Sequence, residues 1–220
     1  MRKIIVISLL AWVLSPTPGL GCGAERWPVK TLADPKAAVV LNSQVQRVMV
    51  AALTAKQSPD RATLEASTSV RFPEELSRYE VTALVVGYKK EADEDFHIVI
   101  ADPANPKKTM IAEIPSSDCV PQQFNQQFAL LQAGFVRDFG KPTAKYKRLK
   151  TPLRVVVTGV GFFDFLHGQT GVAPNGFELH PVLSIEKVSP NVDQAQMMAK
   201  RYRKRLPPFF KVTTGAFAEE

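Results

Sequence analysis

Residues 79–114 read YEVTALVVGYKKEADEDFHIVIADPANPKKTMIAEI, and this stretch decides the fold of the 220-residue chain. β-Branched and aromatic residues dominate residues 79–88, and apolar side chains alternate along residues 96–101, which is typical of a half-buried strand. Aliphatic residues return at residues 109–114. A segment with four acidic residues, 91–95, and a Pro-Ala-Asn-Pro turn separate the three runs. The pattern predicts three consecutive strands joined by short turns.

After the third predicted strand, the apolar residues change to the period of a helix. Five of them recur at intervals of three or four, on one face of the predicted helix: Phe124, Phe128, Leu131, Phe135 and Phe139. Pro121 suits the first turn of this helix and Gly140 suits its end. Further apolar alternation predicts a fourth strand around residues 153–157 and a fifth strand over residues 177–185.

The expected element order is three strands, one helix and two strands. This is the order of an OB-type five-stranded Greek-key barrel, so we expect a mainly β, α+β domain with its helix between strands three and four. An α+β sandwich with the same order is the alternative. The chain divides into an expected signal peptide (1–24), an irregular and helical segment (25–76), the barrel (77–190) and a basic tail (191–220). Within the second part, apolar spacing predicts one short amphipathic helix over residues 45–53.

The first residues have the layout of a secretory signal peptide. Arg2 and Lys3 precede an apolar run over residues 4–14, which prolines and a glycine follow. This layout predicts an extracytoplasmic protein, secreted or periplasmic.

The cleavage site decides what the two cysteines do. Cleavage after Ala24 removes Cys22 and leaves Cys119 alone. Cleavage after Gly19 keeps Cys22 and allows a Cys22–Cys119 disulfide. Lipidation of Cys22, as in a lipoprotein, is the third outcome.

The chain is basic, with a formal net charge of +7, and its charges are clustered. One basic stretch runs from Lys141 to Arg154, and another runs from Lys200 to Arg205. These segments suit an envelope polyanion or an anionic lipid surface as a partner. Nucleic acid is the less favoured partner, because the acidic residues 91–95 lie beside the face on which OB barrels bind their ligands.

Four segments, at residues 79–90, 95–102, 109–115 and 176–182, resemble a group of secreted bacterial proteins that carry no assigned function. The resemblance implies an extracytoplasmic β-rich domain and no particular catalytic residue. The strand order is also similar to that of the thermonuclease-type OB barrel. The carboxylate–arginine set of that family has no residue-by-residue counterpart in this chain, so its activity is not implied.

The expected ligand site lies between the loops that follow the first and fourth strands, residues 91–95 and 164–176. The candidate ligand-binding residues are Tyr88, His97, Asp164, His167, Asn175 and His180. Imidazole and carboxylate groups suit zinc or another divalent ion, and the candidate metal ligands are Asp164, His167, Glu178 and His180. The alternative interpretation is structural, with histidines hydrogen-bonded on the sheet surface and with Asp164 and Asn175 capping turns.

The chain contains neither Gly-x-Ser-x-Gly nor His-Glu-x-x-His, two signatures of hydrolytic enzymes. The favoured hypothesis is therefore a secreted or periplasmic OB-like binding or structural module, without a cofactor, rather than an enzyme. One alternative is a metal-dependent hydrolase that uses the region of Asp164, His167, Glu178 and His180. The other alternative is an envelope-surface protein that associates through its basic segments.

Overall fold

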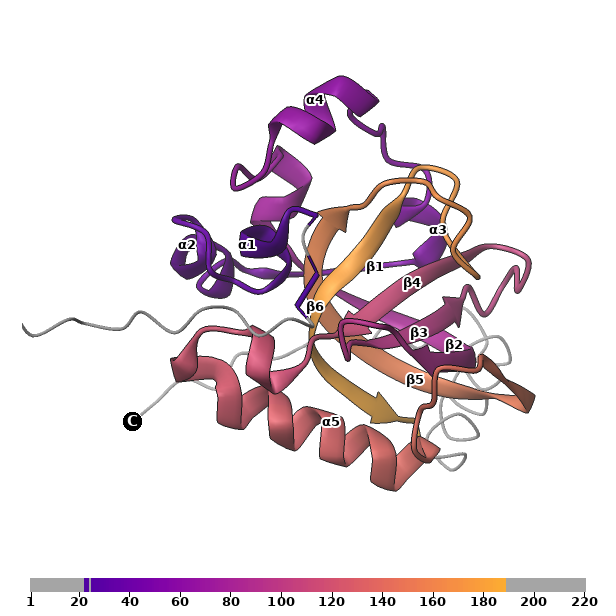
Figure 1. Cartoon of the computed structure of the whole chain (residues 1–220). Helices are drawn as coiled ribbons and strands as arrows, with labels where there is room; N and C mark the ends of the chain where they lie inside the picture. Colours follow the sequence, from indigo (N-terminus) through magenta and orange to yellow (C-terminus); the bar gives the residue numbers. More distant parts are fainter. Residues whose placement is uncertain (1–21, 24, 189–220) are drawn as a thin grey trace, which may run out of the picture.

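A six-stranded mixed sheet that closes into a ring organises the chain (Figure 1). The computed structural model describes residues 22–23 and 25–188. The strands lie in the order β1-β2-β3-β4-β6-β5, and an additional pairing between β2 and β5 closes the ring. Their bounds are β1 Val45–Val48, β2 Arg78–Lys90, β3 Phe96–Ala101, β4 Thr109–Ile114, β5 Lys147–Phe163 and β6 Phe177–Lys187. The α+β class is confirmed, and the sheet has one strand more than the sequence predicted.

Strand β2 makes ring closure possible because it pairs with three other strands. Its first half lies between β1, which is parallel, and β5, which is antiparallel. Its second half, from Leu84, pairs with β3 on one side and with β5 on the other, and a register shift between Val85 and Gly87 bends the strand. Strands β3 and β4 pair antiparallel, whereas β4 and β6 pair in parallel at Ala112 and Leu179. The interior is filled by apolar side chains from every ring strand, including Val81, Ile98, Met110, Val157 and Leu179.

The sixth strand corrects one prediction of the sequence analysis. Residues 45–53 do not form one amphipathic helix, because the chain splits into β1 and the short helix α3, Val50–Leu53. Residues Val45–Val48 complete the ladder of β2, and the helix then buries Val50 and Leu53 completely. The backbone hydrogen bonds available from β2 therefore outweigh the local helical spacing.

The predicted phenylalanine helix is confirmed as α5, Asn125–Phe139, which lies below the ring in Figure 1. It buries Phe128, Phe135 and Phe139 against the sheet. Phe135 meets Tyr88 edge-on at 5.2 Å and stacks on Phe139 at 4.6 Å between ring centroids. Gly140 follows the helix with a φ of 94°, a backbone conformation that favours glycine.

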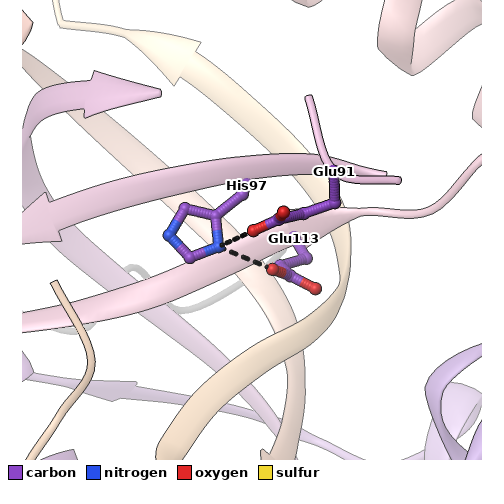
Figure 2. Close-up of side chains that lie close together, drawn as sticks. All are labelled: Glu91, His97 and Glu113. Carbon is purple, nitrogen blue, oxygen red and sulfur yellow. Dashed lines mark hydrogen bonds and ion pairs between the residues drawn. The ribbon is translucent and has the colours of Figure 1, made fainter. Parts of the chain in front are cut away.

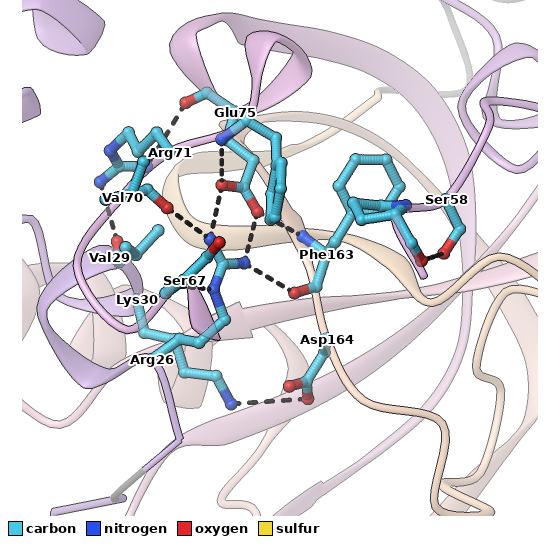
Figure 3. A network of polar contacts seen from close by, with 12 residues as sticks. Arg26, Val29, Lys30, Ser58, Ser67, Val70, Arg71, Glu75, Phe163 and Asp164 are labelled. Carbon is cyan, nitrogen blue, oxygen red and sulfur yellow. Dashed lines mark hydrogen bonds and ion pairs between the residues drawn. The ribbon is translucent and has the colours of Figure 1, made fainter. Parts of the chain in front are cut away.

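Buried ion pairs between side chains hold the segment before the ring in place. Its helices are α1 Trp27–Lys30, α2 Ala37–Leu41, α4 Arg61–Ala66 and the 3₁₀ turn η1 Pro73–Leu76. Arg26 donates to both oxygens of Glu75 and to the carbonyl oxygen of Phe163 at the end of β5 (Figure 3). Arg71 makes a second buried ion pair with Asp34, at 2.6 Å.

A disulfide between Cys22 and Cys119 joins the start of the described chain to the connection between β4 and α5. That connection consists of the 3₁₀ turns η2 Ser117–Cys119 and η3 Gln122–Phe124. Of the outcomes left open by the sequence, the disulfide is compatible with cleavage after Gly19. A lipid on the Cys22 sulfur would use the atom that forms this bond.

Strand β3 differs from its prediction as a half-buried strand, because all six of its residues are buried. The loop of residues 164–176 covers two outward-facing side chains of β3, His97 and Val99. Gly171 lies against Val99, and a Cβ on Gly171 would stand only 2.3 Å from a Val99 methyl group. Its φ of 83° also favours glycine. The long loop is therefore part of the packed structure.

Candidate functional site

A layer of buried polar side chains covers the outer face of β3, β4 and β6. Because side chains alternate along a strand, the residues next to the core positions point outward. On this face they are His97 of β3, Glu113 of β4, and Glu178 and His180 of β6, each at most 8% exposed. Ionisable groups are rarely buried unless they are paired, so this layer is the most unusual chemical feature of the described chain.

His97 and Glu113 are direct cross-strand partners in the β3–β4 ladder. Figure 2 shows His97 Nδ1 between two carboxylates, 2.8 Å from Glu113 Oε1 and 3.3 Å from Glu91 Oε1. The other ring nitrogen, Nε2, is 2.9 Å from the carbonyl oxygen of Thr170 in the long loop. Burial disfavours the charged ring, but the hydrogen bond and charge of Glu113, the carbonyl oxygen of Thr170 and the charge of Glu91 together outweigh burial and raise the pKa of His97.

The second oxygen of Glu113 faces the second histidine. Oε2 of Glu113 is 3.2 Å from His180 Nε2, and Oδ2 of Asp95 is 3.3 Å from the same nitrogen. Burial lowers the pKa of His180, but these two carboxylates raise it more, to about 10. For Glu113 the balance is reversed: burial raises its pKa, and His180 and His97 hold it well below the usual range. Glu113 is therefore an ionised bridge between two imidazoles.

Lys30 of α1 adds a buried cation beside this bridge. Its Nζ atom is 3.4 Å from Asp164 Oδ2 and lies over the ring of Phe162, 5.3 Å from the centroid. Figure 3 shows this lysine reaching toward Asp164 at the start of the long loop. Burial lowers the pKa of Lys30, but the carboxylates of Asp164 and Glu178 outweigh it and raise the pKa above its ordinary value.

Glu178 lies close to other carboxylates in this layer. Burial, followed by the repulsion of Asp164 and Glu113, raises the pKa of Glu178 well above its usual range. Oε1 of Glu178 and Oδ1 of Asp164 are both buried without a hydrogen-bond partner, which leaves two acceptors available inside the layer.

A pocket of about 640 Å³ opens above the polar layer. Its lining comes from the hairpin after β2, the long loop and the N-terminal segment: Gly23, Glu25, Lys30, Lys89, Glu91, Ala92, Asp93, Glu113, Asp164, His167, Gly168 and Gln169. Burial and the neighbouring Asp95 raise the pKa of Asp93 in this lining to about 6. Both loops that the sequence analysis singled out therefore meet at one pocket.

The six predicted ligand-binding residues fall into three groups. Asp164 and His167 line the pocket, and His97 and His180 lie in the polar layer. Tyr88 lies in the core, where its hydroxyl donates to the carbonyl oxygen of Phe139. Asn175 holds the long loop to the end of α3, since its Nδ2 donates to the carbonyl oxygens of Leu53 and Lys56. The structure therefore gives Tyr88 and Asn175 structural positions.

The predicted metal ligands do not come together as one group. His167 is exposed and its Nε2 contacts the Gln169 side chain at 2.7 Å, whereas His180 is buried. In the part of the chain that the structure describes, the two sets with metal-ligating geometry are Glu91–His97–Glu113 and Asp95–Glu113–His180. Only His180 is common to the prediction and these sets.

Three residues of the site were not among the predicted site residues: Lys30, Asp95 and Glu113. Glu113 carried a signal, because it is the one acidic residue in the apolar run TMIAEI and faces His97 once the strands are paired. Asp95 ended an acidic turn that resembled a solvated hairpin. Lys30 carried no local signal, because it reaches the site through the packing of α1.

The first basic segment is exposed at Lys141, Lys145, Lys147, Arg148 and Lys150, on the connection after α5 and the start of β5. The second, Lys200 to Arg205, lies outside the described residues. Among the described residues, no helix combines the length and apolar character needed to span a membrane.

Comparison with protein-family models, curated proteins and solved structures finds no match for this chain.

Proposed function

We propose that this chain is an extracytoplasmic OB-like binding module that holds a small cationic ligand, such as an amine or a guanidinium compound. The observation that carries the proposal is the pocket between the hairpin of residues 91–95 and the loop of residues 164–176. In an OB-type barrel, ligands bind beside the loops after strands one and four. The order of β2, β3, β4, β6 and β5 around the ring, with α5 between β4 and β5, supports this assignment.

The charge of the lining argues for a cation. Five carboxylates line the pocket: Glu25, Glu91, Asp93, Glu113 and Asp164. They face two lysines, each of which already contacts a carboxylate: Lys30 contacts Asp164 at 3.4 Å and Lys89 contacts Glu91 at 2.8 Å. A surplus of negative charge in a partly desolvated pocket attracts cations and repels phosphates.

The same geometry argues against a nucleic acid as the ligand. An oligonucleotide on an OB barrel stacks its bases on the outer face of strands two and three. In this chain that face belongs to β3 and β4. Its side chains Val99 and Ile111 are buried, and Gly171 of the long loop packs on Val99. A flat aromatic surface for stacked bases is therefore replaced by a covered polar layer.

A thermal-shift panel tests the proposal. The purified protein is mixed separately with agmatine, spermidine, arginine, citrate, inorganic phosphate and a single-stranded oligonucleotide. We expect the amines and guanidinium compounds to raise Tm, because a ligand that binds only the folded state stabilises it. The anions should leave Tm unchanged.

Two variants locate the binding. Asp93→Asn removes one pocket charge and should weaken the affinity for the best amine about fivefold, which is the value of an ion pair of about 1 kcal/mol. Glu186→Gln, which removes an exposed carboxylate far along β6, is the matched control and should bind normally. Equal loss in both variants, or no response to any amine, would reject the proposal.

A metal-dependent hydrolase is the second candidate, favoured by the convergence of histidine and carboxylate atoms in the sets Glu91–His97–Glu113 and Asp95–Glu113–His180. Glu113 belongs to both sets and also lines the pocket, so a metal there would meet a pocket ligand. A screen of ester and phosphoester substrates with added zinc tests this candidate. Activity that Glu113→Gln removes would support it, and an inactive zinc-loaded protein would exclude it.

Association with the cell envelope through the basic segments is the third candidate, and the exposure of Lys145, Arg148 and Lys150 favours it. Co-sedimentation with vesicles that contain anionic phospholipid tests it. Binding that falls in a triple Lys145→Glu/Arg148→Glu/Lys150→Glu variant would support the idea, whereas binding equal to that of neutral vesicles would end it.

A further inference from the structure

The side chains of Asp95, Glu113 and His180 converge on one point in the buried layer. Their nearest ligating atoms are Oδ2 of Asp95, Oε2 of Glu113 and Nε2 of His180. All three lie within 4.8 Å of one another, and the nitrogen is 3.3 Å and 3.2 Å from the two oxygens. Around a tetrahedral metal with bonds of about 2.0 Å, neighbouring ligand atoms stand about 3.3 Å apart. The two distances from His180 Nε2 to the carboxylate oxygens match that spacing.

Each of the three side chains uses its other polar atom on a supporting partner. Oδ1 of Asp95 accepts a hydrogen bond from the backbone N–H of Ser116 at 2.8 Å. Oε1 of Glu113 contacts His97 Nδ1 at 2.8 Å. Nδ1 of His180 is 3.1 Å from the carbonyl oxygen of Lys30. Partners of this kind fix the ring tautomer and the carboxylate orientation in metal centres.

The Nε2 atom of His180 supplies an independent observation. Its residue is completely buried, and this nitrogen makes no hydrogen bond although two carboxylate oxygens lie within ion-pair distance. Because Nδ1 of the same ring donates to a carbonyl oxygen, the neutral ring would present its lone pair on Nε2 to two carboxylates. Such an arrangement requires a positive species at Nε2, either a proton or a metal ion.

We propose that Asp95, Glu113 and His180 form a divalent-metal site, with zinc as the ion that its chemistry fits best. One imidazole and two carboxylates are ordinary zinc ligands. Calcium takes six to eight oxygen ligands and magnesium requires a nearly octahedral oxygen set, so three ligands with one nitrogen suit neither ion.

The inference goes beyond the proposed function, because it concerns a metal ion in the buried layer rather than the ligand in the pocket. Glu113 connects the two features, since it belongs to the proposed site and also lines the pocket. Glu91 and His97, which form the other set with Glu113, act as supporting groups in this proposal.

Metal content and metal affinity test the proposal together. The full protein is purified without chelator, its zinc is measured by elemental mass spectrometry, and zinc affinity is measured by competition with a chromophoric chelator. We expect about one zinc per chain, consistent with a single site. Replacement by cobalt should give the visible absorption of a tetrahedral centre.

Nearly isosteric variants separate metal binding from folding. Asp95→Asn and Glu113→Gln should lose zinc while circular dichroism shows a folded protein. His97→Gln, which removes only a supporting group, should weaken zinc binding by about 10- to 100-fold. His167→Ala changes an exposed histidine of the pocket and should keep the metal.

Two results would overturn the proposal. One is a folded wild-type protein that takes up neither zinc nor cobalt. The other is an NMR spectrum in which His180 Nε2 still carries a proton in the presence of one equivalent of zinc, because the positive species would then be a proton. Amine binding is measured separately by thermal shift, so loss of the metal site would leave the proposed function standing, and the reverse also holds.

Discussion

Arg26 and Glu75 form a two-point ion pair in the interior of the protein, with Nη1–Oε1 and Nη2–Oε2 distances of 2.6 and 2.8 Å. Glu75 also accepts hydrogen bonds from the backbone N–H groups of Phe72 and Phe163, each at 2.9 Å. The pair therefore joins α1, η1 and the end of β5, and it holds the wall of the pocket that Lys30 enters.

Arg26→Ala should destabilise the protein by about 3–5 kcal/mol, because it leaves the Glu75 carboxylate buried without its cation. Urea unfolding at neutral pH measures the change. Arg61→Ala is the matched control, since Arg61 pairs with Glu65 on an exposed face of α4 and should change stability little. Equal effects of the two variants would contradict the assigned role of the buried pair.

The disulfide between Cys22 and Cys119 closes a separation of 97 residues. Cys119→Ser should therefore lower stability by about 2–4 kcal/mol, because the unfolded chain gains freedom when the link is lost.

Intact mass and N-terminal sequencing of protein secreted from a bacterial host test the pairing directly. We expect a mature chain that retains Cys22, with a mass two hydrogens below the reduced form. A chain that begins at Glu25, or a lipid on Cys22, would contradict this expectation.

Gly171→Ala should loosen the loop that covers β3. The added methyl group would stand 2.3 Å from a Val99 methyl group, so either the loop or the strand must move. We expect a loss of stability of about 1–3 kcal/mol and faster hydrogen exchange at His97 and Val99. Val99→Ala in the same chain removes the two methyl groups that the new Cβ would meet at 2.3 and 2.6 Å, and it should recover part of the loss. If the loss of stability in the double variant equals the sum of the losses in the two single variants, the contact between Gly171 and Val99 does not fix the position of the loop.

Asp102 should make stability depend on pH in the acid range. Burial raises its pKa, but N–H groups of Ala51, Ala104 and Asn105, together with the positive charge of Lys108, lower it more. A carboxyl group whose pKa is lower in the folded state stabilises the fold above its unfolded pKa, near 3.9, and this contribution is lost as pH falls through the folded pKa.

Asp102→Ala should therefore cost about 1–3 kcal/mol at pH 7, where three hydrogen bonds to a charged acceptor are lost. Its difference from the wild type should shrink below about pH 4. Urea unfolding at pH 7 and pH 3 measures this trend. A difference that stays constant over this range would contradict the ionised role of Asp102.

Local patterns predicted the elements whose residues repeat regularly. Alternation located β3, a run of aliphatic residues located β4, and the spacing of Phe128, Phe135 and Phe139 located α5. The local pattern gave a wrong prediction at residues 45–53. There β1 forms by pairing with β2, which lies more than thirty positions later in the chain. The four residues Val45-Gln46-Arg47-Val48 also show no apolar alternation, so no local period marks them as a strand.

The sequence predicted which two loops border the site, but it predicted fewer of the individual side chains that form it. The two loops meet at the pocket, and four of the six candidate residues lie in it or in the layer beneath it. Glu113 is recognised as a site residue only from the strand register, which places it opposite His97. Lys30 is recognised only from the packing of α1, which places its Nζ over the ring of Phe162. Each depends on tertiary contacts that single-sequence patterns do not encode.

The most direct measurement of the proposed binding function is an amide NMR titration of the isotope-labelled protein with the best amine from the thermal-shift panel. The account predicts the largest shift changes at residues 91–95 and 164–169, with smaller changes at Lys30 and Glu113 beneath them. Saturating changes centred elsewhere, such as along the basic residues 141–150, or no change at any concentration, would contradict it.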